Sequence, residues 1–210
     1  MKKKKKIKLV VLILVIIAIV IVISKVAGNK KVDIKRLSNL YQELNTSQTY
    51  LFDMEKDSDN KTIMAKKGDK TIIDNTSAES HSTTIVKDNN TYLVLHDREE
   101  YYVYEQNNVE QTILTDGIGE IVNKEFKTGT EKVKGKKYFY EEYAGSTMFM
   151  SENTSNISEE EIKTRFYFDN NDDLVYIKTI KGSYQELLKI KVEKQVEDSL
   201  FEIPSNYAEN

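Results

Sequence analysis

The sequence predicts an α+β protein, with an N-terminal transmembrane helix followed by an antiparallel β-sheet that packs against a few helices. Three observations carry this prediction. Residues 9–23 are fifteen consecutive apolar residues with lysines on both sides. Beyond them the chain holds one amphipathic stretch and then many short alternating segments separated by turn residues. The whole chain has 13 tyrosines but only 1 proline and 8 glycines, a composition typical of packed strands.

The apolar run extends from Ile7 to Val26 if Lys8 and Lys25 reach the membrane interfaces with their ammonium groups. Twenty helical residues at about 1.5 Å each span about 30 Å, which matches the hydrocarbon core of a bilayer. Six lysines gather at the N-terminal end, and positive charge stays in the cytoplasm. We therefore expect a single-pass protein of the cell membrane with a cytoplasmic tail at 1–6, a span at 7–26 and one extracytoplasmic domain at 29–210.

A cleaved signal peptide is the alternative, with secretion of the mature protein. Its small-residue cleavage site would be Val26-Ala27-Gly28, and fifteen apolar residues are the upper limit for its hydrophobic region. A lipoprotein anchor is excluded because the chain has no cysteine to acylate.

Composition limits the chemistry of the exported domain. Seven of the 31 Lys and Arg residues lie at or before Lys25, which leaves 24 against 34 Asp and Glu and a charge of about −10. Such a charge argues against nucleic acid as a partner. The absence of cysteine also excludes disulfides, a thiolate nucleophile and a cysteine zinc site.

An amphipathic helix opens the exported domain. Ile34, Leu37, Tyr41 and Leu44 fall three or four residues apart, Asp33 is a candidate N-cap, and Asn45-Thr46-Ser47 ends the run. A second helix is expected at 109–122, where Gly117 and Gly119 each cost about 1 kcal/mol relative to alanine and allow two shorter pieces. A helical turn at Ser158 is the third candidate.

Twelve strands are expected between and after these helices. They lie at 49–54, 63–65, 71–73, 83–86, 91–96, 101–105, 126–133, 137–143, 147–150, 165–168, 174–179 and 187–196, with a polar loop at 151–158.

Hairpin register is tested by asking whether apolar side chains share a face. Pairing Val86 with Leu93, and Leu95 with Tyr102, places these residues and Tyr104 on one face, which we expect to be the core face. His96, Tyr92 and Glu105 then share the opposite, solvent-facing side. In the last hairpin, a turn centred on Asn171-Asp172 pairs Phe168 with Val175 and Phe166 with Ile177.

Candidate metal ligands have simpler structural explanations. Asp169 to Asp173 fits the first half of a calcium-binding EF-hand loop, but Leu174 stands where glycine is needed and Ile180 where the bidentate glutamate belongs, which favours a hairpin turn. The acidic series Asp53, Glu55, Asp57 and Asp59 is expected to be a strand edge and turn.

The two histidines complete the set of candidates. His81 is expected in a polar loop and His96 beside a turn, with no His-x-x-x-His pair. No nucleotide-binding or nucleophile motif is present. The sequence therefore predicts a non-enzymatic protein with no catalytic, cofactor-binding or metal-ligating residue, and it leaves the ligand-binding residues unassigned. The tyrosines suit strands, and alternatively a groove for an amphipathic ligand.

The chain's end, from Leu200-Phe201-Glu202-Ile203-Pro204 to Tyr207, resembles the closing segment of the LolA-like envelope proteins, which comprise lipoprotein carriers and their lipid-binding and sigma-regulatory relatives. The hairpin from Phe168-Asp169 to Leu174–Lys178 is similar to that family's penultimate hairpin. The resemblance implies a curved antiparallel half-barrel, its concave side covered by helices, often around an apolar cavity.

We therefore expect an extracytoplasmic domain that binds an apolar ligand, a lipid or a lipidated protein. The alternative is a sensor or interaction module for a membrane-protein partner, with a core packed tightly by Ile34, Leu37 and Tyr41 and no ligand cavity.

Overall fold

Twelve strands form one sheet in the computed structural model, which describes residues 35–105, 114–144 and 162–210. In these residues the sheet order is β12-β6-β5-β4-β3-β2-β1-β11-β10-β9-β8-β7, and every pair is antiparallel except β12 with β6. The elements are α2 (Arg36–Ser47), β1 (Thr49–Glu55), β2 (Lys61–Lys67), β3 (Lys70–Thr76), β4 (His81–Lys87), β5 (Asn90–Leu95), η1 (His96–Arg98), β6 (Glu100–Glu105), α3 (Leu114–Ile121), β7 (Phe126–Val133), β8 (Lys136–Ala144), β9 (Ile162–Phe168), β10 (Leu174–Lys181), β11 (Tyr184–Glu193), η3 (Asp198–Phe201) and β12 (Ala208–Glu209).

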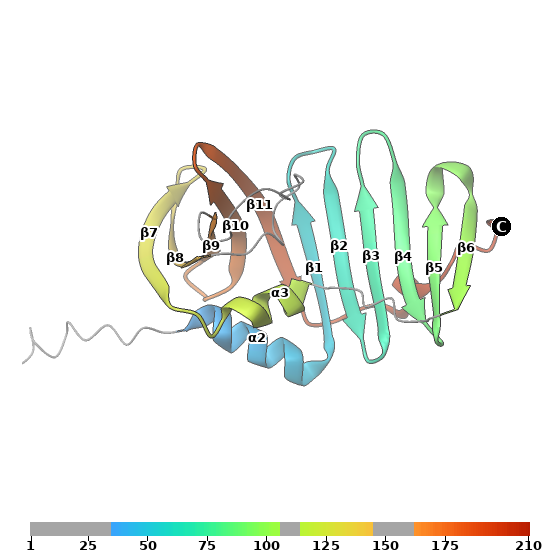
Figure 1. Ribbon diagram of the computed structural model, residues 1–210, viewed down its shortest axis with the longest axis horizontal. Helices are drawn as coiled ribbons and strands as arrows, with labels where there is room; N and C mark the ends of the chain where they lie inside the picture. The colour runs from blue at the N-terminus through green and yellow to red at the C-terminus, as the bar shows by residue number, and fades with distance from the viewer. Residues whose placement is uncertain (1–34, 106–113, 145–161) are drawn as a thin grey trace, which may run out of the picture. The chain divides into compact units, whose positions relative to one another are not determined.

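The sheet is open and curved. Figure 1 shows β7 to β11 curling around the two helices, while β2 to β6 form a flatter wing on the other side of β1. The α+β class and the curved antiparallel sheet with helices packed on it are thus present in the described residues.

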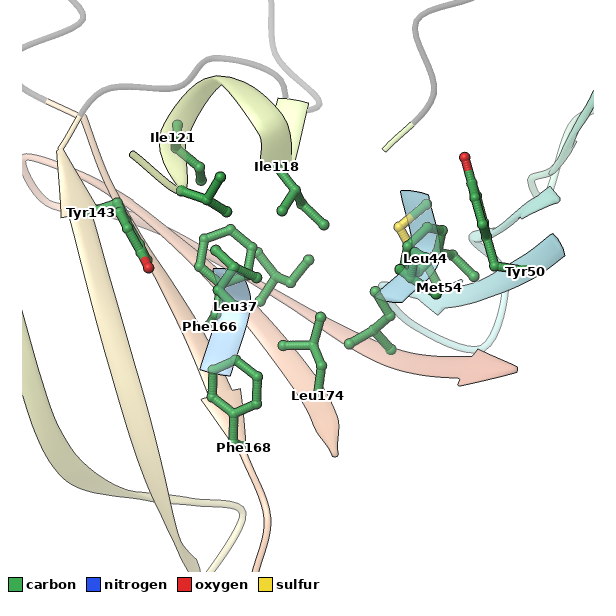
Figure 2. Close-up of a cluster of buried hydrophobic side chains, with 14 residues drawn as sticks. Leu37, Leu44, Tyr50, Met54, Ile118, Ile121, Tyr143, Phe166, Phe168 and Leu174 are labelled. Carbon is green, nitrogen blue, oxygen red and sulfur yellow. The ribbon is translucent and has the colours of Figure 1, made fainter. Parts of the chain in front are cut away.

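The helices cover the curled part of the sheet. The stripe predicted for α2 is correct, since Leu37 and Leu44 are completely buried and Tyr41 packs beside them. They meet Phe52, Phe166 and other apolar residues projecting from β1 and from β8 to β11. Figure 2 shows this cluster, which we call the helix core; its buried members are Leu37, Leu44, Tyr50, Phe52, Met54, Ile118, Ile121, Val122, Tyr143, Phe166, Phe168, Leu174, Ile177 and Ile190.

A buried carboxylate fixes the start of α2. The residue before the helix, Lys35, makes no capping bond with its side chain. Instead Glu141 of β8, itself completely buried, accepts hydrogen bonds from the backbone N–H groups of Arg36 (2.7 Å) and Leu37 (3.2 Å) and from the Tyr143 hydroxyl (2.9 Å). An anion at a helix N-terminus satisfies free N–H groups and favours the helix dipole. Burial raises the pKa of Glu141, and these hydrogen bonds partly oppose that shift.

Glycine lets α3 approach α2 closely. A Cβ atom placed on Gly119 would lie 2.9 Å from the Tyr41 hydroxyl oxygen, closer than side chains normally pack. The glycines that weaken this helix in isolation therefore include one at a close approach of the two helices, where a larger residue would force the Tyr41 ring to shift. The described part of the helix, from Leu114, agrees with the prediction, and the expected start at 109–113 lies outside the described residues.

The hairpins of the flat wing confirm the predicted faces but not the predicted pairs. Val86 pairs with Thr91 and Leu93 with Tyr102, two residues away from the expected register. The β4–β5 turn is centred on Asp88-Asn89, both with positive φ, because that two-residue turn suits the twist of the strands. A shift of two residues leaves every side chain on its predicted face.

The choice of core face in this wing was wrong. Val94 and Ile85, on the face assigned to solvent, are 1 % exposed, whereas Tyr104 on the expected core face is 49 % exposed. The reason is that the C-terminal part of the chain packs over the face that carries Val94 and Ile85.

The β9–β10 hairpin follows its prediction in part. Phe166 pairs with Ile177 as predicted, but Phe168 pairs with Leu174 instead of Val175, because the register shifts by a bulge near Val175. Asp169 accepts N–H bonds from Asn171 and Asp173 in the connecting turn, so the EF-hand-like segment is a hairpin turn.

Several predictions fall outside the described residues: the span at 7–26, Ile34 of the helix stripe, the strand at 147–150, the loop at 151–158 and the turn at Ser158. The predicted N-cap Asp33 is wrong, because α2 begins at Arg36 and Lys35 occupies its N-cap position. Within the described ranges, no helix is both long and apolar enough to cross a bilayer.

Candidate functional site

The C-terminal segment, residues 194–207, crosses the face of the flat wing that lies opposite the helices. It begins where β11 ends in the middle of the sheet and leads to β12, which pairs with the edge strand β6. Its Val196 and completely buried Phe201 pack on Ala65, Ile72 and other apolar residues of β2 to β5. We call this cluster the wing core; its buried members are Ala65, Ile72, Ile85, Val94, Val196 and Phe201.

Two lysines of the sheet bind the backbone of this segment. Lys67 Nζ donates to the carbonyl oxygen of Val196 (3.1 Å) and to the Asp198 carboxylate (2.8 Å). Lys87 Nζ donates to the carbonyl oxygen of Phe201 (2.7 Å). An irregular segment cannot satisfy its own carbonyl groups as a helix does, so these ammonium groups supply the missing donors.

Between the sheet and the segment lies a cavity of about 380 Å³. Its floor is apolar and consists of Ile63, Ile72, Ile85 and Val94 from four neighbouring strands. Polar side chains form one end: Asp74, His81, Thr83 and His96. The remaining lining residues are Lys61, Thr76, Ser199, Leu200, Glu202 and Pro204.

The polar end is held by a continuous chain of hydrogen bonds. Asp74 Oδ2 lies 3.0 Å from His81 Nε2 and 2.6 Å from Thr83 Oγ1. Thr83 Oγ1 lies 2.7 Å from His96 Nε2, and His96 Nδ1 lies 3.0 Å from the Tyr207 hydroxyl of the C-terminal segment. The two imidazole rings stack, with centroids 3.8 Å apart and planes inclined by 16°. We call these five residues the histidine cluster.

Donors and acceptors in this cluster fit one arrangement of protons. The Asp74 carboxylate can only accept, so the single Thr83 proton is donated to it and Thr83 must accept from His96 Nε2–H. Nδ1 of a neutral His96 then accepts from Tyr207. Burial, and then the neighbouring His81, lowers the pKa of His96, which agrees with the neutral ring.

This arrangement is the reverse of a nucleophile and its base. A base must take the proton of the hydroxyl, but His96 Nε2 already donates a proton to Thr83. The Thr83 residue is also only 4 % exposed. The geometry suits recognition of a polar group better than attack on one.

The structure corrects the expected place of the first histidine. His81 is not in a loop but is the first residue of β4, opposite Thr76 of β3. His96 does lie beside a turn, yet the C-terminal segment makes its face half-buried instead of solvent-facing. Sequence reasoning missed Asp74, Thr83 and Tyr207. The alternation of β3 to β5 was the available signal, because the correct register places these positions on one face.

The acidic series is engaged in its own strand edge and turn. Asp53 pairs with Lys61 and Glu55 with Lys189, at 3.0 and 2.7 Å. Asp57 accepts hydrogen bonds from the backbone of Asp59 and Asn60 in the β1–β2 turn.

Strand tyrosines on the outer face of the curled part pack with charged residues. Tyr167 is completely buried and donates to Glu131 (2.6 Å). Arg165 bonds the same carboxylate and covers the Tyr140 ring at 4.6 Å. These tyrosines are therefore engaged in contacts within the sheet, as expected of aromatic residues that serve as strand residues.

Comparison with known proteins gives fold likenesses of low similarity. No protein-family model and no curated protein sequence matches the chain. An uncharacterised conserved protein from Thermus thermophilus is 8 % identical to this chain, with a TM-score of 0.45. The match covers 82 % of this chain and 95 % of the Thermus protein. The lipoprotein LppX of Mycobacterium tuberculosis is 14 % identical with a TM-score of 0.38, covering 79 % and 98 %. At these scores neither structure indicates what this chain binds.

Proposed function

We propose that this chain is a membrane-anchored, extracytoplasmic and non-catalytic domain that binds an amphipathic ligand of the lipid class in the cavity under its C-terminal segment. The observation that carries the proposal is the division of that cavity into an apolar floor and a polar end. A free lipid and the acyl chain of a lipoprotein share the chemistry that this cavity fits.

Size and lining support this ligand class. About 380 Å³ lies at the lower end of the range for small-molecule sites, which are mostly apolar with a few placed polar groups. The floor of Ile63, Ile72, Ile85 and Val94 suits an alkyl chain. Each buried methylene of such a chain contributes about 0.8 kcal/mol.

The polar end would fix the direction of the ligand. The histidine cluster presents imidazole and carboxylate groups at one side of the cavity, where Lys61 lies opposite Thr76, while Glu202 lines it elsewhere. A head group with hydrogen-bonding atoms is therefore favoured over a plain hydrocarbon. The resemblance of the chain's end to LolA-like proteins points to the same ligand class.

Native mass spectrometry of the fragment 29–210 tests the proposal. We expect a co-purifying lipid and saturable binding of a fluorescent fatty acid. Thr76 is exposed and lines the cavity, so the large side chain of Thr76→Trp should obstruct the cavity and weaken fatty-acid binding. Asn75→Trp is the matched control, because Asn75 is also exposed but lies on the opposite face of β3, so this change should leave binding unchanged. A clean apo mass together with no fatty-acid binding would contradict the proposal.

The anchor is tested separately. The proposed protein stays with membranes through carbonate washing, and protease added outside intact cells digests residues 29–210. Recovery of a soluble mature protein that begins near Asn29 would show instead that the apolar segment is a cleaved signal peptide.

An interaction module is the second candidate, favoured by one observation. Val103 and Tyr104 of β6 are 36 % and 49 % exposed, and they leave one large apolar side chain exposed on each face of a strand close to the sheet edge. Crosslinking in membranes distinguishes the two functions: one stoichiometric protein partner that is lost in Tyr104→Lys supports the module, and its absence argues against it.

A further inference from the structure

Both histidines of the 210-residue chain lie in one cluster with a carboxylate, although they are fifteen residues apart. We propose that His81, His96 and Asp74 form a site for a divalent transition-metal ion of the zinc class. Two imidazoles and one carboxylate are a ligand set that zinc accepts, and a fourth position is then left for water or another ligand. Metal binding needs no lipid, so this inference goes beyond the proposed function and does not depend on it.

The three side chains are close enough to share an ion. One potential ligand atom from each lies within 4.8 Å of the others. Asp74 Oδ2 and His81 Nε2 are 3.0 Å apart. Two ligands bound tetrahedrally at about 2.0–2.1 Å from zinc are about 3.3–3.4 Å apart, so this pair needs to separate only slightly.

The stacked rings define what must change on binding. The two rings lie in nearly parallel planes, inclined by only 16° with centroids 3.8 Å apart, whereas an ion bound by both rings lies in the plane of each. Metal entry therefore requires the rings of His81 and His96 to splay apart. The Nε2 protons also have to move to Nδ1, a tautomeric shift that leaves both rings neutral and releases no net proton.

Tyr207 is suited to act as a positioning residue for this site. Its hydroxyl lies 3.0 Å from His96 Nδ1, the nitrogen that carries the proton once Nε2 binds the metal. Metal-ligating histidines generally donate their second N–H to such an outer group, which fixes the ring and its tautomer. Since Tyr207 belongs to the C-terminal segment, the metal would also tie that segment to the sheet.

Zinc titration of the full, untagged chain in a non-ionic detergent tests the site near neutral pH. Calorimetry should show saturation at one Zn²⁺ per chain. The variants His81→Ala, His96→Ala and Asp74→Asn should each weaken binding at least about tenfold. Asp59→Asn removes an exposed carboxylate from the acidic turn and serves as the control that leaves binding unchanged.

Histidine NMR signals of the wild-type chain give a readout that does not depend on a variant folding. Because the chain has two histidines, both ring signals should shift together and stop shifting at one equivalent of Zn²⁺. Tyr207→Phe should keep the one-to-one stoichiometry while lowering the affinity about 10- to 100-fold. Movement of a single histidine's signals, no saturation at one equivalent, or equal Zn²⁺ binding by His96→Ala would overturn the proposal.

Discussion

Around Leu37, Phe52 and Phe166 the sheet packs against two helices, whereas around Ile72 and Val94 its opposite face packs against an irregular C-terminal segment. Both regions bury apolar side chains to near-zero exposure. They differ in what covers them. A helix satisfies its internal backbone groups, so the helix core can be almost entirely apolar.

The irregular segment needs polar partners from the sheet, and these partners bring chemistry to the wing core. Lys67 and Lys87 bind its carbonyl groups, and His96 bonds its Tyr207. The same cover leaves the cavity of about 380 Å³ open between sheet and segment. The irregular covering therefore leaves a cavity with a polar end, whereas the helix covering forms a continuous apolar core.

The largest expected effect comes from the helix core. Phe166→Ala removes a completely buried ring and should lower the free energy of unfolding by about 3–5 kcal/mol. Denaturant unfolding of the fragment 29–210 measures the loss. A change below about 1 kcal/mol would mean that the helices do not supply the main stability of the domain.

The matching change in the wing core should act locally. Phe201→Ala also removes a completely buried ring, but the C-terminal segment can relax around the gap, so we expect a smaller loss of about 2–3 kcal/mol. Hydrogen exchange should accelerate in residues 196–207 before it does in α2. Equal acceleration in both regions would remove the distinction between the two coverings.

The carboxylate cap of α2 connects helix and sheet. Glu141→Ala leaves the N–H groups of Arg36 and Leu37 and the Tyr143 hydroxyl without their acceptor. Loss of a helix cap costs about 0.5–2 kcal/mol and unpaired buried groups cost more, so about 2 kcal/mol is expected from unfolding curves. Glu142→Ala is a neighbouring control that leaves this cap intact and removes an ion pair with Arg165 on the outer face.

The pH dependence of this cap has a defined sign. Burial raises the folded-state pKa of Glu141 above its ordinary value of 4.5, so the folded protein holds this proton more tightly than the unfolded chain does. The stability advantage of the wild type over Glu141→Ala should therefore shrink as the pH rises from 4.5 through the raised pKa. An advantage that grows with pH across this window would show that burial does not dominate the shift.

The smallest effect concerns one lysine of the wing. Lys87→Met removes the ammonium group that donates to the Phe201 carbonyl and should destabilise the C-terminal segment by about 1 kcal/mol. Hydrogen exchange of residues 196–207 measures it. Lys194→Met is the control, because its ion pair with Glu43 is exposed and contributes little; an equal effect of both changes would argue against carbonyl bonding as the cause.

Local patterns predicted much of this fold. The stripe through Leu37, Tyr41 and Leu44 gave the helix, and alternation gave the strands and the faces of the wing. The core face of the wing could not be chosen, because Leu93 and Leu95 on one face are as apolar as Tyr92 and Val94 on the other. The core face is determined by the C-terminal segment, which packs on the face that carries Val94.

Long-range partners account for what sequence reasoning missed at the site. The bond between His96 and Tyr207 joins residues 111 positions apart, and the cap of α2 joins residues 105 positions apart. His81 meets His96 through the registers of β3, β4 and β5, of which the predicted β4–β5 register was off by two. Spacing within the sequence carries no trace of such contacts.

Methyl NMR of the fragment 29–210 titrated with a medium-chain fatty acid tests most directly that the ligand site lies under the C-terminal segment. We predict saturable shifts of the methyl signals of Ile63, Ile72, Ile85 and Val94, which line the cavity, with those of Ile118 and Ile121 in the helix core unchanged. Shifts confined to Ile118 and Ile121 would place the ligand beneath the helices and contradict this account.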